Sequence, residues 1–190
     1  MSSPQRAIWA EQRRQARRTR RRQEYERGLR PMAIAACNIS KEHNVGSLIR
    51  TAHAAAAEEV LLVGSREWNV EAARTSELYT RVIHLDDSTA LLAHTAARGW
   101  NLVAVELDPR AVNLFDACYP DRPCFVLGAE VGGLPDDILA AAALVVQIPQ
   151  WGLVPSLNLA VAGSIVFYDC LAKLYHQGRL DRPGGGLISD

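Results

Sequence analysis

The sequence lacks any long apolar run. No stretch approaches the ~18 uninterrupted apolar residues that a membrane-spanning helix needs, and no apolar segment typical of a secretory signal stands at the N-terminus. These absences predict a cytoplasmic protein that does not enter a membrane. Because 48% of the 190 residues are hydrophobic, the chain can still bury a core as one domain, which excludes a wholly disordered protein.

Cysteine is scarce as well. The four cysteines, Cys37, Cys118, Cys124 and Cys170, form no CxxC pair and have no nearby histidine at metal-ligand spacing. A chain of this size with so few cysteines is not typical of a disulfide scaffold. We therefore expect reduced, buried cysteines and no metal site, with a zinc site as the less favoured alternative.

Net charge is absent from the chain as a whole but not from its parts. The 21 basic and 21 acidic residues balance, yet residues 1–30 hold ten arginines and three glutamates, a net charge of +7. The remaining 160 residues therefore carry a net charge of −7. This asymmetry predicts a basic N-terminal arm joined to an acidic body.

The arm, residues 1–30, is rich in helix formers but has almost no apolar stripe, so we expect it to be flexible or helical. Guanidinium groups pair well with phosphate, and clustered arginine is typical of proteins that bind nucleic acid. A solvated tail and a targeting peptide are the alternatives. The predicted RNA-binding residues are Arg13, Arg14, Arg17, Arg18, Arg20, Arg21 and Arg22.

The body, residues 31–178, alternates between short apolar runs and segments with helical spacing. The expected strands cover residues 32–37, 59–64, 82–85, 100–107, 124–128 and 144–149. The expected helices cover residues 45–57, 88–98, 136–142 and 156–177. Strands that alternate with helices predict an α/β fold with a largely parallel sheet.

The last expected helix begins at Ser156 as its N-cap and stops at Gly178. Its predicted apolar stripe consists of Leu157, Val161, Ile165, Tyr168 and Leu171. Residues 179–190 contain three consecutive glycines and are expected to form a disordered tail.

Three segments of the body, residues 44–52, 127–135 and 148–158, follow the ends of predicted parallel strands. Open α/β sheets bind ligands at that edge, and glycine-rich loops there expose backbone groups that can hold a heterocycle or a ribose. Each residue alone also allows a structural reading. Arg50 could form a surface ion pair, Glu130 could cap the next helix, and Asn158 could bond within its own first turn.

Taken together, the three segments resemble motifs one, two and three of the SpoU (TrmH-type) branch of the SPOUT RNA methyltransferases. The first carries Asn, Gly and Arg, the second Leu-Gly-x-Glu followed by Gly-Leu, and the third Ile-Pro through Gly to Ser-Leu-Asn. Order and spacing match, and the resemblance covers about residues 31–178. The sequence departs from the family pattern at Gln150, Pro155 and residues 160–163. The resemblance implies that these positions touch a cofactor pocket and a dimer helix.

The resemblance implies a parallel-sheet SPOUT domain with a C-terminal deep trefoil knot. It also implies S-adenosylmethionine (SAM) as methyl donor, a homodimer, and methylation of a ribose 2′-hydroxyl in tRNA or rRNA. The implied catalytic residues are Arg50, Asn44, Glu130, Ser156 and Asn158. The implied cofactor-binding residues are Leu107, Leu127, Gly128, Ile148, Gly152 and Leu157.

A guanidinium group stays protonated in proteins, so we expect Arg50 to hold a phosphate and to stabilise developing alkoxide charge instead of removing a proton. The proton would then leave through that phosphate, Glu130 or water. One alternative is a Rossmann-type methyltransferase that holds the donor ribose with Glu106 or Asp108, but no GxGxxG loop follows the first strand. The other is a non-catalytic RNA-binding module that retains the knotted fold.

Overall fold

A parallel sheet of seven strands forms the centre of the protein. The computed structural model describes residues 4–38, 42–64, 68–129, 132–153 and 156–180. The strands are β1 (Arg30–Cys37), β2 (Ala57–Val63), β3 (Val82–Leu85), β4 (Asn101–Val105), β5 (Val112–Asn113), β6 (Pro123–Leu127) and β7 (Leu144–Gln147). They lie in the order β3-β2-β1-β6-β4-β7-β5 with every pairing parallel. The predicted fold class is confirmed, while the trefoil knot stays a prediction.

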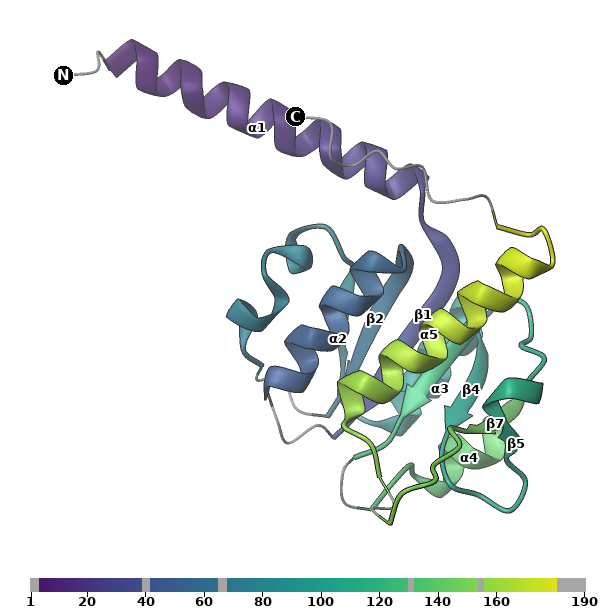
Figure 1. Ribbon diagram of the computed structural model, residues 1–190. Helices are drawn as coiled ribbons and strands as arrows, with labels where there is room; N and C mark the ends of the chain where they lie inside the picture. Colours follow the sequence, from purple (N-terminus) through teal and green to yellow (C-terminus); the bar gives the residue numbers. More distant parts are fainter. Residues whose placement is uncertain (1–3, 39–41, 65–67, 130–131, 154–155, 181–190) are drawn as a thin grey trace.

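Helices cover both faces of the sheet (Figure 1). The α-helices are α1 (Pro4–Arg27), α2 (Glu42–Ala54), α3 (Ser88–Arg98), α4 (Asp136–Ala141) and α5 (Leu159–His176), and the 3-10 helices are η1 (Val70–Ala73), η2 (Ser76–Leu78) and η3 (Leu114–Asp116). One core cluster joins the sheet to α2 and α5, and the other joins it to α3 and α4. The central strands are therefore buried on both faces, as their continuous apolar runs predict.

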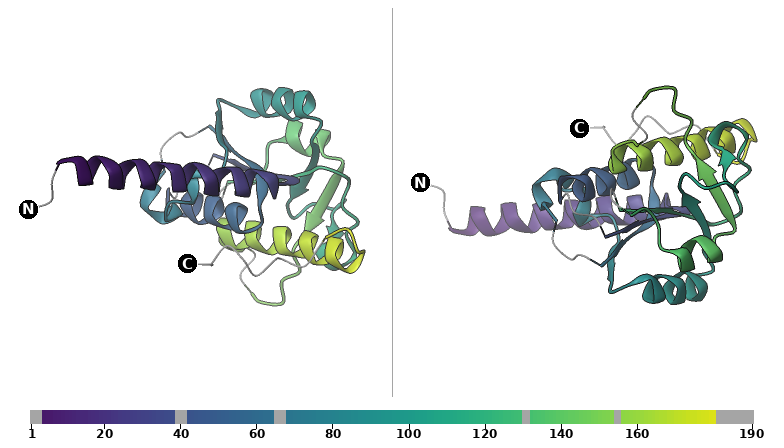
Figure 2. Two further views of the ribbon diagram at one scale, coloured as in Figure 1. Left: turned by 90° about the horizontal axis from the view of Figure 1, so that it is seen from above. Right: turned by 90° about the horizontal axis from the view of Figure 1, so that it is seen from below.

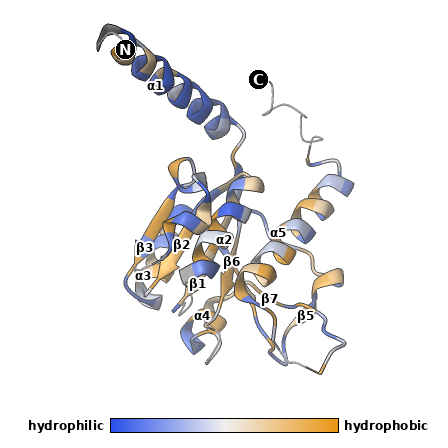
Figure 3. Cartoon of the chain, turned by 60° about the vertical axis from the view of Figure 1, so that its left-hand side comes forward, coloured by the Kyte–Doolittle hydropathy of each residue, from blue (hydrophilic) through white to orange (hydrophobic). Residues whose placement is uncertain are grey.

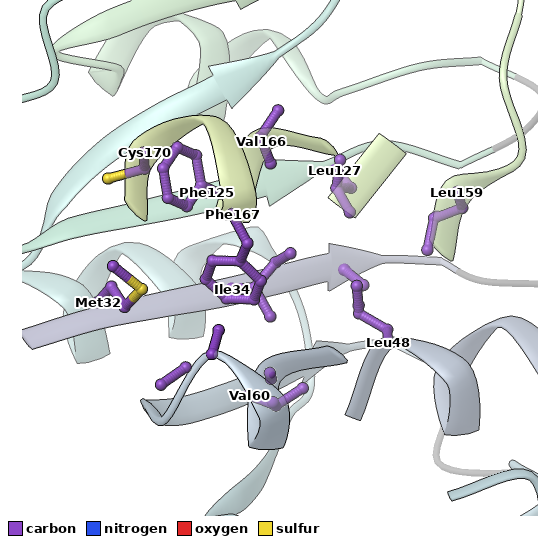
Figure 4. Packing of buried hydrophobic residues seen from close by; sticks show 14 of the residues in the cluster. Met32, Ile34, Leu48, Val60, Phe125, Leu127, Leu159, Val166, Phe167 and Cys170 are labelled. Carbon is purple, nitrogen blue, oxygen red and sulfur yellow. The ribbon is translucent and has the colours of Figure 1, made fainter. Parts of the chain in front are cut away.

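The larger core lies between the sheet, α2 and α5 (Figure 4). Phe125 of β6 meets Phe167 of α5 edge-on, with ring centroids 5.7 Å apart. Gly163 allows α5 to approach closely, because a Cβ there would lie 2.4 Å from Cδ1 of Leu48 on α2. This packing brings the first turns of α2 and α5 together at the carboxyl edge of the sheet.

The basic segment forms one continuous helix, α1, which projects from the body (Figures 1 and 2) and is hydrophilic along most of its length (Figure 3). Its apolar residues Ile8 and Trp9 are exposed, whereas Tyr25 near its end is buried, with an exposed fraction of 8%. The Tyr25 ring lies 4.4 Å from the ring of His53 on α2, and its hydroxyl donates to the His53 carbonyl oxygen at 3.3 Å. The last turns of α1 are therefore held on the body.

The second and last helices differ from their predicted bounds. The helix predicted over residues 45–57 ends at Ala54, because Ala56 has a φ of 53° and β2 begins at Ala57. The last helix begins after Asn158, whose side-chain oxygen accepts N–H groups of the first turn and acts as the N-cap. The prediction of Ser156 as the N-cap was therefore wrong by two residues.

The buried face of α5 also differs from the predicted stripe. Val161 and Tyr168, which belong to that stripe, are 47% and 53% exposed. The buried residues are Leu159, Ala160, Gly163, Val166, Phe167 and Cys170. The prediction failed because α5 is apolar on almost every side, so periodicity does not single out the face that packs.

Three of the four cysteines are buried as expected, but Cys118 is exposed, which corrects the prediction for that residue. Burial, assisted by a neighbouring carboxylate, raises the pKa of the Cys37 and Cys170 thiols to about 12. Within the described part of the chain, no helix is long and apolar enough to cross a membrane, and no group of three His, Cys, Asp or Glu could hold a metal ion. The predicted tail lies outside the described residues from position 181 onward.

Candidate functional site

A cavity of about 210 Å³ opens at the carboxyl edge of the sheet, where β4, β6 and β7 end. It is lined by Val105, Glu106, Leu127, Gly128, Ala129, Gly133, Ile148, Gln150, Ser156, Leu157, Leu159 and Ala162. The lining consists mostly of apolar side chains and glycine backbone, with one carboxylate. This composition suits a small ligand that has an apolar ring and a few polar groups.

Two glycines let the chain reverse after β6. A Cβ on Gly128 would lie 2.4 Å from the carbonyl carbon of Gly133, so only glycine allows this approach. The Ala129 N–H donates to the Gly133 oxygen at 3.3 Å, and Gly133 itself has a φ of 65°. One wall of the cavity is therefore built from backbone groups instead of side chains.

The carboxylate in the cavity belongs to Glu106, the first residue after β4. Its Oε1 accepts the N–H of Leu107 at 2.9 Å, and its Oε2 accepts the N–H of Leu134 at 3.0 Å. The side chain therefore ties the loop after β6 to the end of β4.

A second polar contact joins the first turns of α2 and α5. The Asn158 Nδ2 donates to the Asn44 Oδ1 at 2.9 Å, while the Asn158 Oδ1 accepts the N–H of Ala160 at 3.0 Å. Asn44 is 7% exposed whereas Asn158 is exposed, so the contact is shielded from water on the α2 side only. The first and third motif segments thus meet side chain to side chain.

Arg50 lies on the exposed face of α2, which it shares with Ser47, while Leu48 and Ile49 between them are buried. Among the described residues, the lining of the cavity includes neither Arg50 nor the Asn44–Asn158 pair. The guanidinium is therefore accessible to a ligand that approaches from outside the cavity.

Four of the six residues predicted to bind the cofactor line the cavity, namely Leu127, Gly128, Ile148 and Leu157, and Ser156 lines it too. Leu107 and Gly152 are not among its described lining residues, and Leu107 is exposed. Glu130 lies outside the described residues. The roles assigned to all of these residues stay predictions.

Sequence reasoning missed several of the residues that line the cavity. Glu106 was considered only for the disfavoured Rossmann-type alternative, and Gln150 only as a departure from the family pattern. The signal that could have found Glu106 is its position, an acidic residue directly after a buried strand at the ligand-binding edge. Leu159 was not considered, and Ala162 was considered only among residues 160–163, which depart from the family pattern.

A larger cavity of about 510 Å³ lies at the opposite, amino edge of the sheet, where Arg30 begins β1 and Pro123 begins β6. Beside it, Tyr119 and Lys173 both donate to one carboxylate oxygen of Asp169, at 2.6 and 2.8 Å. Its described lining contains none of the predicted site residues. The second and third motif segments therefore meet at the smaller cavity, and the first reaches them through the contact between Asn44 and Asn158.

The profile of the SpoU rRNA Methylase family matches residues 31–168. The chain belongs to this family. Family membership, predicted from the three motifs, is thus confirmed. A relative named tRNA (guanosine(18)-2′-O)-methyltransferase from Escherichia coli (strain K12) is 32% identical over 143 residues, or 74% of this chain. The chain spans 62% of the length of that curated relative.

A relative with the same name from Thermus thermophilus is 27% identical over 186 residues, 90% of each chain. Among solved structures, the A. aeolicus TrmH/SpoU tRNA modifying enzyme superposes with a TM-score of 0.77 at 25% identity, covering 90% of this chain and 88% of that one. The AdoMet-bound rRNA methyltransferase from Sinorhizobium meliloti superposes with a TM-score of 0.69 at 28% identity, covering 77% of this chain and 57% of that one.

Proposed function

We propose that this chain is a SAM-dependent methyltransferase that methylates a ribose 2′-hydroxyl in tRNA or rRNA. The observation that carries the proposal is the cavity at the carboxyl edge of the sheet, where the second and third SpoU motifs meet. The names of the relatives support it, since several are tRNA 2′-O-methyltransferases, and one neighbouring structure holds AdoMet.

The cofactor would bind in this cavity. Backbone groups around Leu127, Gly128, Ile148 and Leu157 would hold the adenosine. The resemblance adds Leu107 and Gly152 to this set. SAM, when bound, supplies a methyl group on a sulfonium that is ready for in-line transfer. The task left to the protein is to orient the acceptor and to exclude water from the transfer.

The acceptor hydroxyl is barely acidic near neutral pH, so the protein must stabilise the alkoxide that develops on it. The exposed guanidinium of Arg50 can bind an RNA phosphate and place its positive charge beside that oxygen. Asn44, Ser156 and Asn158 would surround the acceptor nucleotide together with Glu130. The proton would leave through the phosphate, Glu130 or water.

RNA would also bind along α1. Every described arginine of this helix is exposed, and the helix projects from the body (Figure 1). The residues after position 30 carry a net charge of −7, opposite to that of the arm. The arginine cluster at positions 13–22 would contact phosphates, which orients the RNA without reading its bases.

The active form would be a cytoplasmic homodimer. Support comes from the apolar side chains that α5 and the loop before it leave exposed, namely Val161, Tyr168, Trp151 and Leu153. Exposed apolar surface of this kind marks protein interfaces. Sedimentation of the purified protein should give twice the chain mass of 20.8 kDa, and a monomer across micromolar concentrations would exclude the dimer.

Methyl transfer to RNA tests the proposed function. The purified protein is incubated with SAM and either unmodified tRNA or protein-free rRNA, and the RNA is then digested to nucleosides for mass spectrometry. We expect a 2′-O-methylnucleoside that is absent without the protein. RNA binding without any methylated nucleoside on either RNA would favour the non-catalytic RNA-binding module.

A further inference from the structure

The Glu106 carboxylate is the one charged group in the described lining of the cavity, and none of the proposed steps uses it. Each of its two oxygens accepts one backbone N–H, from Leu107 on one side and Leu134 on the other. A carboxylate has about four acceptor positions in total, two on each oxygen. One position on each oxygen therefore stays available to a ligand in the cavity.

The carboxylate is also held in one orientation. Its two backbone donors come from different segments, the end of β4 and the loop after β6, so rotation of the side chain would break at least one hydrogen bond. Gly133 leaves room for this arrangement, because a Cβ at that position would lie 2.6 Å from Oε2. The free acceptor positions are therefore fixed before a ligand binds.

We propose that Glu106 binds the methyl donor by accepting hydrogen bonds from the ribose hydroxyls of its adenosine. This inference rests on the proposed function. The remaining lining offers two neutral polar side chains, Gln150 and Ser156, among apolar residues and glycine backbone. A vicinal diol presents two hydroxyl donors side by side, which matches two fixed carboxylate acceptors, whereas the sulfonium centre has no hydrogen to donate.

The same chemistry is known at the carboxyl edge of other parallel sheets, where an acidic residue after a strand holds the ribose of a nucleotide. Here the acidic residue directly follows β4, next to the cavity wall formed by Gly128 and Gly133. The arrangement predicts that the protein distinguishes a ribose from a deoxyribose in its methyl donor.

Calorimetric titration with S-adenosylhomocysteine and its 2′-deoxy and 3′-deoxy analogues tests this proposal on the full chain. In the wild type, at least one deoxy analogue should bind about tenfold more weakly or worse, the loss expected for one hydrogen bond to a charged acceptor. Glu106→Ala should bind S-adenosylhomocysteine more weakly than the wild type does by a similar factor. The affinity of this variant for the deoxy analogue should be no lower than its affinity for S-adenosylhomocysteine. Asp108→Asn is the matched control, because Asp108 is paired with Arg110 outside the cavity lining and its loss should leave all three affinities unchanged.

A merely structural role for Glu106 would give a different pattern. The contrary outcome is that Glu106→Ala lowers the affinity for all three ligands by the same factor, so that the deoxy analogues still bind more weakly than S-adenosylhomocysteine by the wild-type ratio. In that case Glu106 would only support the loop, and the proposal would be overturned. Should Glu106→Ala fail to fold, Glu106→Gln replaces it in the same titrations, because it keeps one acceptor oxygen. Independently of any variant, equal affinity of the wild type for all three ligands would also reject the proposal. A wild type that binds no S-adenosylhomocysteine would instead overturn the proposed function, together with this inference.

Discussion

Glu59 shows how single residues of this protein hold a charge inside the core. The carboxylate is fully buried on β2 and accepts hydrogen bonds from Arg98 at 2.8 Å, His94 at 3.0 Å and Trp100 at 3.1 Å. Burial by itself would raise the pKa of Glu59, but the three hydrogen bonds and the charge of Arg98 lower that pKa below its usual value. The ionised form is therefore the stable one, and it ties β2 to α3 and to the start of β4.

This network predicts a pH dependence of stability. Because the pKa of Glu59 is lower in the folded than in the unfolded protein, its contribution is fully present above the unfolded value of about 4.3 and is lost as the pH falls through the folded value. Glu59→Gln should unfold at a lower urea concentration than the wild type at pH 7. The difference should shrink as the pH falls below about 4. A difference in urea midpoint between the two proteins that stays constant from about pH 7 to about pH 3 would contradict the lowered pKa of Glu59.

Arg50 carries the residue-level prediction for the reaction. Arg50→Ala should lower methyl transfer by at least about a hundredfold, the range for loss of a group that stabilises transition-state charge, while SAM affinity stays within about twofold of the wild type. Arg81→Ala removes an exposed arginine beside β3 and should change neither quantity. Normal turnover of Arg50→Ala would remove this residue from the mechanism.

Residue identities at the site were partly accessible from sequence, because motif positions follow strand ends that meet at one edge. The contact between Asn44 and Asn158 was not, since it depends on how α2 and α5 pack across 114 positions of chain. The same holds for Glu106, whose two backbone donors come from separate loops.

At the scale of elements, two glycines in helices set how closely neighbours pack. A Cβ on Gly46 of α2 would lie 2.9 Å from backbone atoms of η1, at Ala72 and Ala73, which cannot move without shifting that element. A Cβ on Gly163 of α5 would first meet Cδ1 of Leu48, the flexible end of a side chain. The two positions therefore differ in how easily the neighbour yields.

Gly46→Ala should lower the free energy of unfolding by about 1–3 kcal/mol, the cost of overpacking a rigid contact. Gly163→Ala should change it by less than about 1 kcal/mol, because the higher helix propensity of alanine offsets the smaller strain. Urea denaturation of both variants provides the measurement. A larger loss at Gly163 than at Gly46 would show that the contact with Leu48, not the contact with η1, is the rigid one.

Elements with local signals were predicted closely and elements without them were not. The helix over residues 88–98 has the predicted bounds, since Asp87 caps it and Gly99 ends it with a φ of 66°. By contrast, the two residues of β5 and the three 3-10 helices are too short to leave a periodic pattern. α5 was misplaced because its cap, Asn158, lies two residues beyond another good cap former.

At the scale of the whole molecule, charge is divided between two parts. α1 carries most of the positive charge of residues 1–30, and Tyr25 holds its last turns on a body with a net charge of −7. The parallel sheet and its covering helices follow from the alternating pattern of the body, whereas that pattern does not give the strand order, and the knot was implied only by resemblance. A path of the chain through its own loop leaves no mark on hydrophobic periodicity.

The arm predicts a salt-dependent affinity for RNA. Replacing Arg13, Arg14, Arg17 and Arg18 by glutamine should weaken binding and flatten the slope of log affinity against log salt, because fewer phosphate contacts release fewer counterions. Lysine at the same four positions keeps the charge and should keep most of the slope. A titration of tRNA binding over salt concentration measures both. Equal slopes for the glutamine variant and the wild type would exclude these four arginines from phosphate contacts.

The central claim is that the cavity at the carboxyl edge of the sheet holds the methyl donor. A crystal structure of the protein with S-adenosylhomocysteine tests it most directly. We expect the adenosine to lie against the backbone of Gly128 and Ile148, with its ribose at Glu106. A ligand found in the larger cavity beside Lys173, with the smaller cavity unfilled, would contradict the account.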